Sequence, residues 1–492
     1  MTQLNPTSTP RALLLPLVLG ALSAHASAGD LYVDDDLMEY PNAGYTSIQD
    51  AVDSSSSGDN IYVYPGTYTG TGAEVVKVDK EISLRAVTSL GEVIIDGQGW
   101  RRCLTALGRD ADTTTDSIAV SNFTIVNGLA QFGQALNSEH GGGIYAEGFV
   151  SIKSCKISSC HAQGSGGGLA IFNPSLYGGT TNDSGIDVCP YTLVWVWDSV
   201  VENCLADGDG GGVWNWESEV DLVGADIQQN GAYGRGGGIA AHHWYTENGA
   251  TNLKREGGTD LPTGIWANTA EGDGGGIFCE GNKGILWLEK AEIVGNRALA
   301  GDGGGACLFN ARARYRDAMV AHNDADQGIS GGHGGGIAAR ASSISHSNYV
   351  DTILTLFENT ADSGGGGIYA KASELELNAA QLEGNQTLGK GGGMAIISCV
   401  AFALEGCTFL ENIGRVAGGL YLKNTYGTLT DSSVLYNQGF FNGGMNGAGV
   451  AVDGGGAELV ISGTNFWQNT KKHYLEGNGG VVTDGLGNLV QP

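Results

Sequence analysis

The stretch DGGGIFCEGNKGILWLEKAEIVGNRALAGDGGGA, residues 273–306, begins and ends with the same run of three glycines behind an aspartate. Between the two runs lie short segments in which apolar and polar residues alternate, followed by an asparagine at position 296. Such alternation is typical of β-strands with one buried face, and the glycines allow tight turns. The pattern continues along the chain, where the residue after the glycine run stands at positions 144, 169, 213, 239, 277, 306, 337, 368, 394, 420 and 450.

A second marker, an asparagine three residues after an apolar residue, accompanies most of these runs. The asparagines are Asn203, Asn230, Asn268, Asn296, Asn323, Asn359, Asn385, Asn412, Asn437 and Asn469, and Cys160 takes the same place in one more copy. Most repeats span about 26 to 31 residues without helical periodicity, which fits one coil of a β-solenoid. Coils stack about 4.8 Å apart. We therefore expect the asparagine amides to hydrogen-bond along a ladder.

These repeats resemble the paired GGA[IVL] and FxxN repeats of polymorphic outer membrane proteins, with FLEN (409–412) and FWQN (466–469) as literal copies of the second motif. Near the N-terminus, YTSIQDAVDSSSSGDNIYVYPGTYTG (45–70) and VIIDGQG (93–99) resemble the first coils of the pectate-lyase-like superfamily. The resemblance implies an all-β fold, a single-stranded right-handed parallel β-helix. The repeats predict roughly 13 coils, and the amphipathic segment SIQDAVDSS (47–55) predicts a short N-terminal cap helix over the first open edge.

The chain divides into four predicted regions. Residues 1–28 have the features of a signal peptide, with Arg11, the apolar segment 12–24 and an ASA cleavage site at 26–28. Residues 29–70 are expected to form the N-terminal cap and first strands, residues 71–480 the β-helix with insertions near 173–191 and 242–263, and residues 481–492 a C-terminal tail. We expect export to the cell surface or the medium. No later segment is long and apolar enough for a transmembrane helix.

Charge and cysteine content limit the partners. The chain has 25 basic and 53 acidic residues, a net charge of −28. Such a field repels nucleic acid and anionic lipid, and it would repel a polyuronate unless a divalent cation bridged the two. Nine cysteines in an exported chain leave two possibilities open, buried thiols or one or two disulfides.

The residue before each glycine run forms one predicted column, in which opposite charges largely alternate. Asp273 and Asp302 are the exception, because like charges one coil apart either raise a carboxyl pKa or recruit a cation such as calcium. His333 follows Asp302 in the column, and the stacked carboxylate should raise the pKa of the imidazole. Asp273, Asp302 and His333 are therefore the candidate catalytic residues, and the two aspartates are also the candidate metal ligands.

Aromatic residues gather between positions 195 and 245, beside the two predicted insertions. Strand alternation places Trp195 and Trp197 on one face, and likewise Trp214 and Trp216. Together with Trp244 and Tyr245 they are candidates for stacking on sugar rings, and the alternative is a local hydrophobic core. His242 and His243 are not expected to bind a metal together, because adjacent strand residues point to opposite faces.

The resemblance also implies catalytic motifs that can be sought directly. Pectate lyases carry an arginine base in an R-x-P-x-x-R setting, which the chain lacks, and the G-H-G at 332–334 comes without the R-I-K of polygalacturonases. We therefore predict a secreted or surface protein that binds a polysaccharide or mediates adhesion. The alternatives are a polysaccharide lyase assisted by calcium or a glycoside hydrolase, each with a diverged site, and a purely structural surface component.

Overall fold

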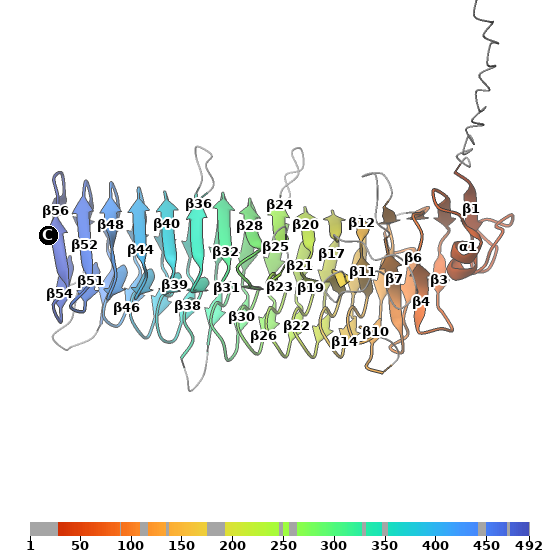
Figure 1. Ribbon diagram of the computed structural model, residues 1–492, viewed down its shortest axis with the longest axis horizontal. Helices are drawn as coiled ribbons and strands as arrows, with labels where there is room; N and C mark the ends of the chain where they lie inside the picture. The colour runs from red at the N-terminus through yellow and green to blue at the C-terminus, as the bar shows by residue number, and fades with distance from the viewer. Residues whose placement is uncertain are drawn as a thin grey trace, which may run out of the picture.

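The computed structural model describes residues 28–88, 90–108, 117–133, 137–174, 192–245, 249–254, 263–326, 331–346, 353–440, 449–469 and 473–491. These residues form a long rod of stacked coils (Figure 1). Its strands belong to four parallel sheets of 16, 11, 14 and 15 strands. The predicted all-β parallel β-helix is confirmed, with about 14 coils, one for each strand of the 14-stranded sheet.

The opening stretch of sequence illustrates one coil. It consists of β27 (Ile277–Glu280), β28 (Ile285–Glu289), β29 (Ala291–Val294) and the two-residue strand β30 (Arg297–Ala298). We name the sheets that contain these four strands C, A, B and D, respectively. Sheet A runs from β1 (Asp30–Val33) to β55 (Val481–Asp484), sheet B from β3 (Gly66–Tyr68) to β56 (Leu489–Gln491), and sheet D from β10 (Leu129–Ala130) to β50 (Gln438–Gly439).

Sheet C contains the strands that follow the glycine runs. In spatial order its strands are β4 (Glu74–Val78), β7 (Arg102–Leu107), β11 (Ile144–Glu147), β15 (Leu169–Phe172), β19 (Val213–Trp216), β23 (Ile239–His242), β27, β31 (Ala306–Phe309), β35 (Ile337–Arg340), β39 (Ile368–Lys371), β43 (Met394–Ile397), β47 (Leu420–Lys423), β51 (Val450–Asp453) and β54 (Tyr474–Gly477). Each strand pairs with the next without a register slip, so equivalent residues form straight columns along the rod.

The predicted amide ladder is present, but it begins one residue away from where the sequence suggested. Asn230 Nδ2 donates to Asn268 Oδ1 at 3.1 Å, and the same bond recurs at 2.9 to 3.0 Å between successive ladder asparagines up to Asn469. Asn203 lies outside the ladder, because it pairs in register with Gln229 and has a φ of +54°. Cys204 takes the ladder position, and its N–H donates to Asn230 Oδ1.

The N-terminal end of the rod carries the single helix of the described residues, α1 (Ile48–Ser54). Ser47 caps it by accepting the N–H of Asp50, and Ile48, Ala51 and Val52 are buried against the first coil. The predicted cap helix is therefore present. At the other end, β55 and β56 pair with the preceding coil, so the predicted tail, 481–492, instead continues the solenoid.

Several sequence predictions fall on residues outside the described ranges. These residues include nearly all of the predicted signal peptide and most of the insertion at 173–191, together with 246–248 and 255–262 of the second insertion. No helix among the described residues is long and apolar enough to cross a membrane. The eight described cysteines are all buried free thiols, which favours the first of the two possibilities left open above.

Candidate functional site

The outer face of sheet C carries most of the chemically active side chains. On each strand the second and fourth residues point outward, and along the rod they form two columns. From β35 to β47 the first column reads Ala338, Tyr369, Ala395 and Tyr421, and the second reads Arg340, Lys371, Ile397 and Lys423. The residue before each glycine run, here called the turn column, lies beside the first column, and His333, Gly364 and Lys390 are stacked in register within it.

His333 lies at the centre of a group of five side chains, the His333 cluster. The other members are Asp302, Arg340, Tyr369 and Lys371. His333 Nδ1 lies 3.2 Å from Asp302 Oδ1, and the backbone N–H of His333 donates to the same oxygen at 3.0 Å. Asp302 is fully buried, and Arg340 forms an ion pair with its other oxygen. These contacts with a buried carboxylate hold the imidazole in one orientation.

Tyr369 and Gly364, which has no side chain, shape the space around the imidazole of His333. The rings of His333 and Tyr369 lie 4.2 Å apart, centroid to centroid, at an angle of 43°. On either side of Tyr369 the first column holds only alanine, Ala338 and Ala395. Gly364 follows His333 in the turn column, where a Cβ atom would come within 3.8 Å of both the imidazole and Ala395. The flank of His333 is therefore left open to a ligand.

The environment of His333 favours a neutral ring. Burial lowers the pKa of His333 below its ordinary value, and the charge of Lys371 lowers the pKa further. Since Nδ1 faces a carboxylate oxygen of Asp302, the hydrogen-bond pattern assigns the ring proton of the neutral imidazole to Nδ1 and leaves a lone pair on Nε2. Nε2 has no hydrogen-bond partner among the described residues. The predicted rise in the pKa of His333 is wrong, because burial and the charge of Lys371 lower it.

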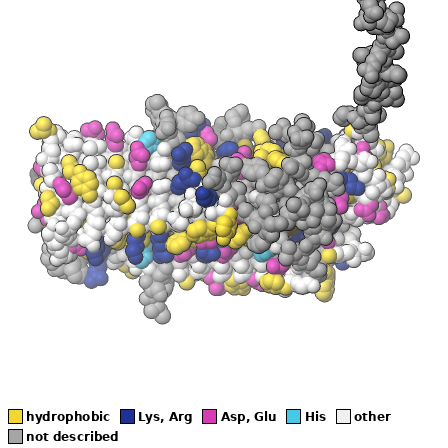
Figure 2. Space-filling model, in the orientation of Figure 1, with side chains coloured by type: hydrophobic (Ala, Val, Ile, Leu, Met, Phe, Trp, Pro, Cys, Tyr) yellow, Lys and Arg dark blue, Asp and Glu magenta, His cyan; other side chains and the backbone are white. Residues whose placement is uncertain are grey.

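Cationic side chains gather next to this imidazole, although the chain as a whole is strongly acidic. Arg340, Lys371 and Lys423 occupy three of four successive positions in the second column, and no carboxylate belongs to either column from β35 to β47. Figure 2 shows dark-blue Lys and Arg side chains along the lower side of the rod near β39. Lys371 is exposed and Arg340 is half-buried. The cluster can therefore hold an anionic group beside Nε2 of His333.

A second histidine on the same face has a different environment. His242 Nδ1 lies 2.7 Å from Glu280, and its Nε2 lies 3.4 Å from Asp209. Arg235 forms ion pairs with both carboxylates. Burial works to lower the pKa of His242, but the hydrogen bonds and charges of the two carboxylates outweigh it and raise the pKa. Its side chain is only 3% exposed, so His242 is enclosed between two carboxylates that favour its protonated form and is less suited than His333 to act as a base.

The sequence showed no carboxylate near His242, because Asp209 and Glu280 come from the coils on either side. Aligning the fourth residue of every sheet C strand would have found Glu280, which follows His242 directly, whereas Asp209 belongs to the turn column. The same alignment would have found Arg340 and Lys371, which sequence reasoning also missed. The adjacent histidines have different partners, since His243 Nε2 lies 3.4 Å from Thr251 Oγ1 and burial lowers the pKa of His243 to about 3.

The two predicted metal ligands face cations that the protein itself supplies. Asp273 Oδ1 accepts the N–H of Asp302 at 2.7 Å, and its pKa is raised by burial against the lowering effect of Arg340 and Arg235. Asp302 is occupied by Arg340 and His333. Asp302 is therefore paired with side chains of the protein itself, and Asp273 lies within the charge influence of Arg340 and Arg235.

The structure divides the predicted aromatic site among three places. Trp214 and Trp216 lie on the outer face of sheet C, where Trp214 is only 6% exposed and stacks on His140 at 4.4 Å. Trp195 and Trp197 lie on β16 (Leu193–Trp197) of sheet A, half-buried and facing outward. Trp244 and Tyr245 follow β23 at the corner between sheets C and A, where the buried Glu217 accepts the backbone N–H of each. The six residues therefore do not form one row.

Sheet A presents its own outward column, which the sequence did not single out. It runs from Trp195 through Asp221 and Asn252 to Trp287 and Arg314. Asn252 Nδ2 donates to Asp221 Oδ1 at 2.7 Å, so the polar residues between the two tryptophans are linked to each other. In Figure 2 a second group of dark-blue side chains lies over β32 (Arg312–Arg316), the strand of Arg314.

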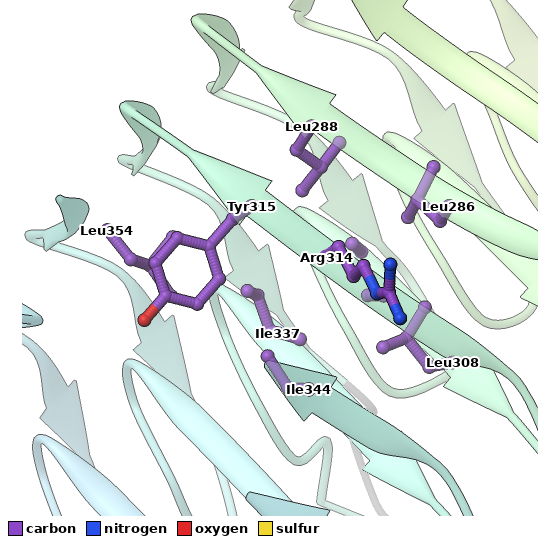
Figure 3. A pocket seen from close by; sticks show the side chains of 10 residues that line it. Leu286, Leu288, Leu308, Arg314, Tyr315, Ile337, Ile344 and Leu354 are labelled. Atoms are coloured by element: carbon purple, nitrogen blue, oxygen red, sulfur yellow. The ribbon is translucent and has the colours of Figure 1, made fainter. Parts of the chain in front are cut away.

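A cavity inside the solenoid is not a ligand site. It is lined by ten residues, including Leu286, Leu308, Tyr315 and Ile344 (Figure 3). Its volume of about 10 Å³ is close to the least that holds one water molecule. Tyr315 Oη accepts the N–H of Asn378 at 3.2 Å, which gives this polar atom in the core a partner.

Comparisons with known proteins identify similar folds but no family. Neither a protein-family model nor a curated protein matches the chain. Among solved structures, it is similar to the mannuronan C-5 epimerase AlgE6 A-module of Azotobacter vinelandii, with 10% identity, 90% of this chain and 93% of that chain covered, and a TM-score of 0.30. It is also similar to the periplasmic alginate epimerase AlgG, with 12% identity, 94% of this chain and 84% of that chain covered, and a TM-score of 0.32. A third similar structure is tailspike protein 3 of bacteriophage CBA120, with 10% identity, 94% of this chain and 61% of that chain covered, and a TM-score of 0.33. We assign no residue role from these similarities.

Proposed function

We propose that the chain binds an acidic polysaccharide along the outer face of sheet C and removes a proton from it with His333. The observation that carries this proposal is the neutral imidazole, held by Asp302 at Nδ1 and open at Nε2, beside Arg340 and Lys371. A neutral imidazole is a suitable general base, and cations beside it stabilise the negative charge that develops on proton removal. The predicted signal peptide would deliver the protein to such polymers outside the cell.

A uronic-acid unit suits this arrangement. Its C5 carries both a hydrogen and the carboxylate, so Arg340 and Lys371 could hold the carboxylate while His333 Nε2 takes the C5 proton. The electron pair of the broken C–H bond then forms the C4–C5 double bond, and the bond from C4 to the glycosidic oxygen breaks. Tyr369, whose pKa burial raises, keeps its proton at neutral pH and could give it to the departing oxygen. The reaction is a β-elimination that needs no bridging calcium.

The test compares proton removal in the natural chain and two histidine variants. The protein is incubated in D₂O with a panel of uronic-acid polymers and one neutral glycan. Unsaturated ends are followed by ultraviolet absorbance, and exchange at C5 is followed by NMR. We expect His333→Gln to lower the rate by about 10² to 10⁴-fold. His161→Gln, which changes a half-exposed histidine on sheet D paired with Asp207, should leave the rate unchanged.

Each outcome bears on one of the hypotheses. If no uronic-acid polymer shows unsaturated ends or C5 exchange, the catalytic proposal is wrong. Polymer binding without turnover, weakened by Lys371→Gln, would instead support a protein that only binds polysaccharide. Failure to bind any acidic polymer contradicts both.

A second candidate function, binding of a neutral glycan, rests on sheet A. Trp195 and Trp287 face outward in one column, three strands and therefore about 14 Å apart, with Asp221 and Asn252 between them. Flat aromatic faces separated by hydrogen-bonding groups suit a run of sugar rings. Trp287→Ala should weaken retention on immobilised neutral glycans, and unchanged retention would exclude this surface.

A further inference from the structure

Three carboxylates gather at the N-terminal end of the rod, far from sheet C. Asp34, Asp36 and Glu39 belong to the segment VDDDLMEY, 33–40, which follows β1. One oxygen from each lies within 4.8 Å of the others. No Lys, Arg or His forms an ion pair with any of them among the described residues. Three negative charges so close together repel each other strongly unless a cation lies between them.

The buried member of the group gives a second, independent indication of a ligand. Asp34 is completely buried, and its Oδ2 accepts the N–H of Tyr40 at 2.5 Å. Its Oδ1 has no hydrogen-bond partner among the described residues. A buried carboxylate oxygen without a partner costs free energy, and such atoms usually mark a missing ion or water. Hydrogen bonds within the segment leave this oxygen unused.

We propose that Asp34, Asp36 and Glu39 bind a calcium ion. All three ligands are carboxylates, and calcium prefers such hard oxygen ligands, whereas zinc prefers thiolate and imidazole ligands. Three carboxylates from a six-residue segment supply half or less of the six to eight oxygens that calcium accepts, with backbone carbonyls and water available for the rest. Calcium tolerates irregular geometry, whereas magnesium requires a nearly ideal octahedron. The site is independent of the proposed function on sheet C.

The ion would fasten the cap of the solenoid. Asp34 donates its N–H to Tyr45 O at 3.0 Å, which ties the segment to the residues just before α1. The adjacent Asp35 accepts the N–H of Thr67 at the start of the next coil. Binding would therefore link β1, α1 and the first complete coil. The open edge of sheet A begins here, so calcium should stabilise the end of the rod against fraying.

Terbium luminescence can test the site in the full chain, because Tb³⁺ replaces calcium and is excited through nearby tyrosines. Tyr40 belongs to the segment itself and stacks on Tyr64 at 4.7 Å. We expect Tb³⁺ emission that calcium displaces, and a thermal midpoint that rises by a few degrees with calcium and falls with a chelator. Asp36→Asn with Glu39→Gln should abolish both effects. These two side chains are exposed, so the variant should fold even if a change at Asp34 does not.

A matched control carries the same change of charge elsewhere. Glu374→Gln with Glu405→Gln alters two exposed carboxylates on sheet A and should retain both the emission and the calcium-dependent midpoint. If the Asp36 and Glu39 variant keeps the natural response, the ion binds elsewhere and the proposal is wrong. If the natural chain binds neither Tb³⁺ nor calcium, the proposal is also wrong.

Discussion

At the residue scale, two histidines on one sheet face show how neighbours decide chemistry. His242 has a carboxylate near each nitrogen, which raises its pKa and favours the protonated ring. His333 has one carboxylate at Nδ1, and Arg340 already balances that charge. Burial and Lys371 therefore determine its protonation. Of the two, only His333 has the protonation state that a base requires near neutral pH.

The pH dependence of the reaction should reveal this difference. A lowered pKa keeps His333 deprotonated to lower pH, so kcat/KM should rise with pH through a midpoint below the ordinary histidine value of about 6.5. Lys371→Gln removes a charge that disfavours the imidazolium ion, so the midpoint should move upward, towards 6.5. A pH profile of kcat/KM for both proteins checks the shift.

The control for this experiment is His140→Gln. His140 also has a lowered pKa, but its Nδ1 accepts the N–H of Ser165 and its ring stacks on Trp214. The midpoint should therefore not change in this variant. A downward shift in the Lys371 variant, or an upward shift in the His140 variant, would show that another group limits the rate.

At the scale of the element, the asparagine ladder connects the coils more strongly than the surface contacts do. Asn359 Oδ1 accepts the N–H and the side-chain amide of Asn323, and its own Nδ2 donates to Val320 O and Asn385 Oδ1. All these groups are buried. Asn359→Ala should therefore leave several without partners and lower the free energy of unfolding by about 2 to 4 kcal/mol.

Asn203→Ala makes the same substitution just outside the ladder. This substitution should lower the free energy of unfolding by less, about 1 kcal/mol. It breaks no bond of the ladder, and the loss arises because alanine tolerates the observed positive φ less well than asparagine does. Denaturant unfolding of the two variants measures the difference. Equal losses would mean that the ladder contributes no more than a turn residue.

The ladder also shows how far sequence reasoning extended. Glycine runs and asparagines mark backbone turns and a buried column, so they predicted the coils and nine ladder positions, while the amphipathic segment 47–55 predicted the cap helix. The tenth was misplaced by one residue, because Val200 and Val201 are both apolar and the motif was counted from Val200, whereas Val201 is in register with Ile227 and Cys204 takes the ladder position. The site was predicted less well. Asp302 and His333 were found in one column, whereas Arg340, Tyr369 and Lys371 come from other columns and approach them only through the outward faces of neighbouring strands.

At the scale of the whole molecule, a net charge of −28 repels the anionic substrate that the proposed function requires. The solenoid resolves this conflict by separating charges along its length and around its circumference. Its columns let the part of sheet C from β35 to β47 collect Arg340, Lys371 and Lys423, while carboxylates of the same column, Glu280 and Asp453, lie in earlier and later coils. The general field of a protein is screened beyond about 8 Å at physiological salt, whereas contacts at a few ångströms are screened less.

This separation predicts an unusual salt dependence for oligouronate binding. At low salt the field of the whole rod repels the ligand and weakens binding. Added salt first screens that repulsion and only later weakens the short contacts with Lys371 and Lys423, so affinity should pass through a maximum. Replacing both lysines with glutamine should lower affinity at every salt concentration and leave no maximum, because the short-range attraction between the two lysines and the ligand is lost.

Calorimetric titration over a range of NaCl concentrations measures this effect. A variant with Lys283→Gln and Lys290→Gln has the same net charge and is the control, so it separates the attraction by Lys371 and Lys423 from the effect of net charge. Binding in the control should match the natural chain, and an equal loss in both variants would mean that only total charge governs association.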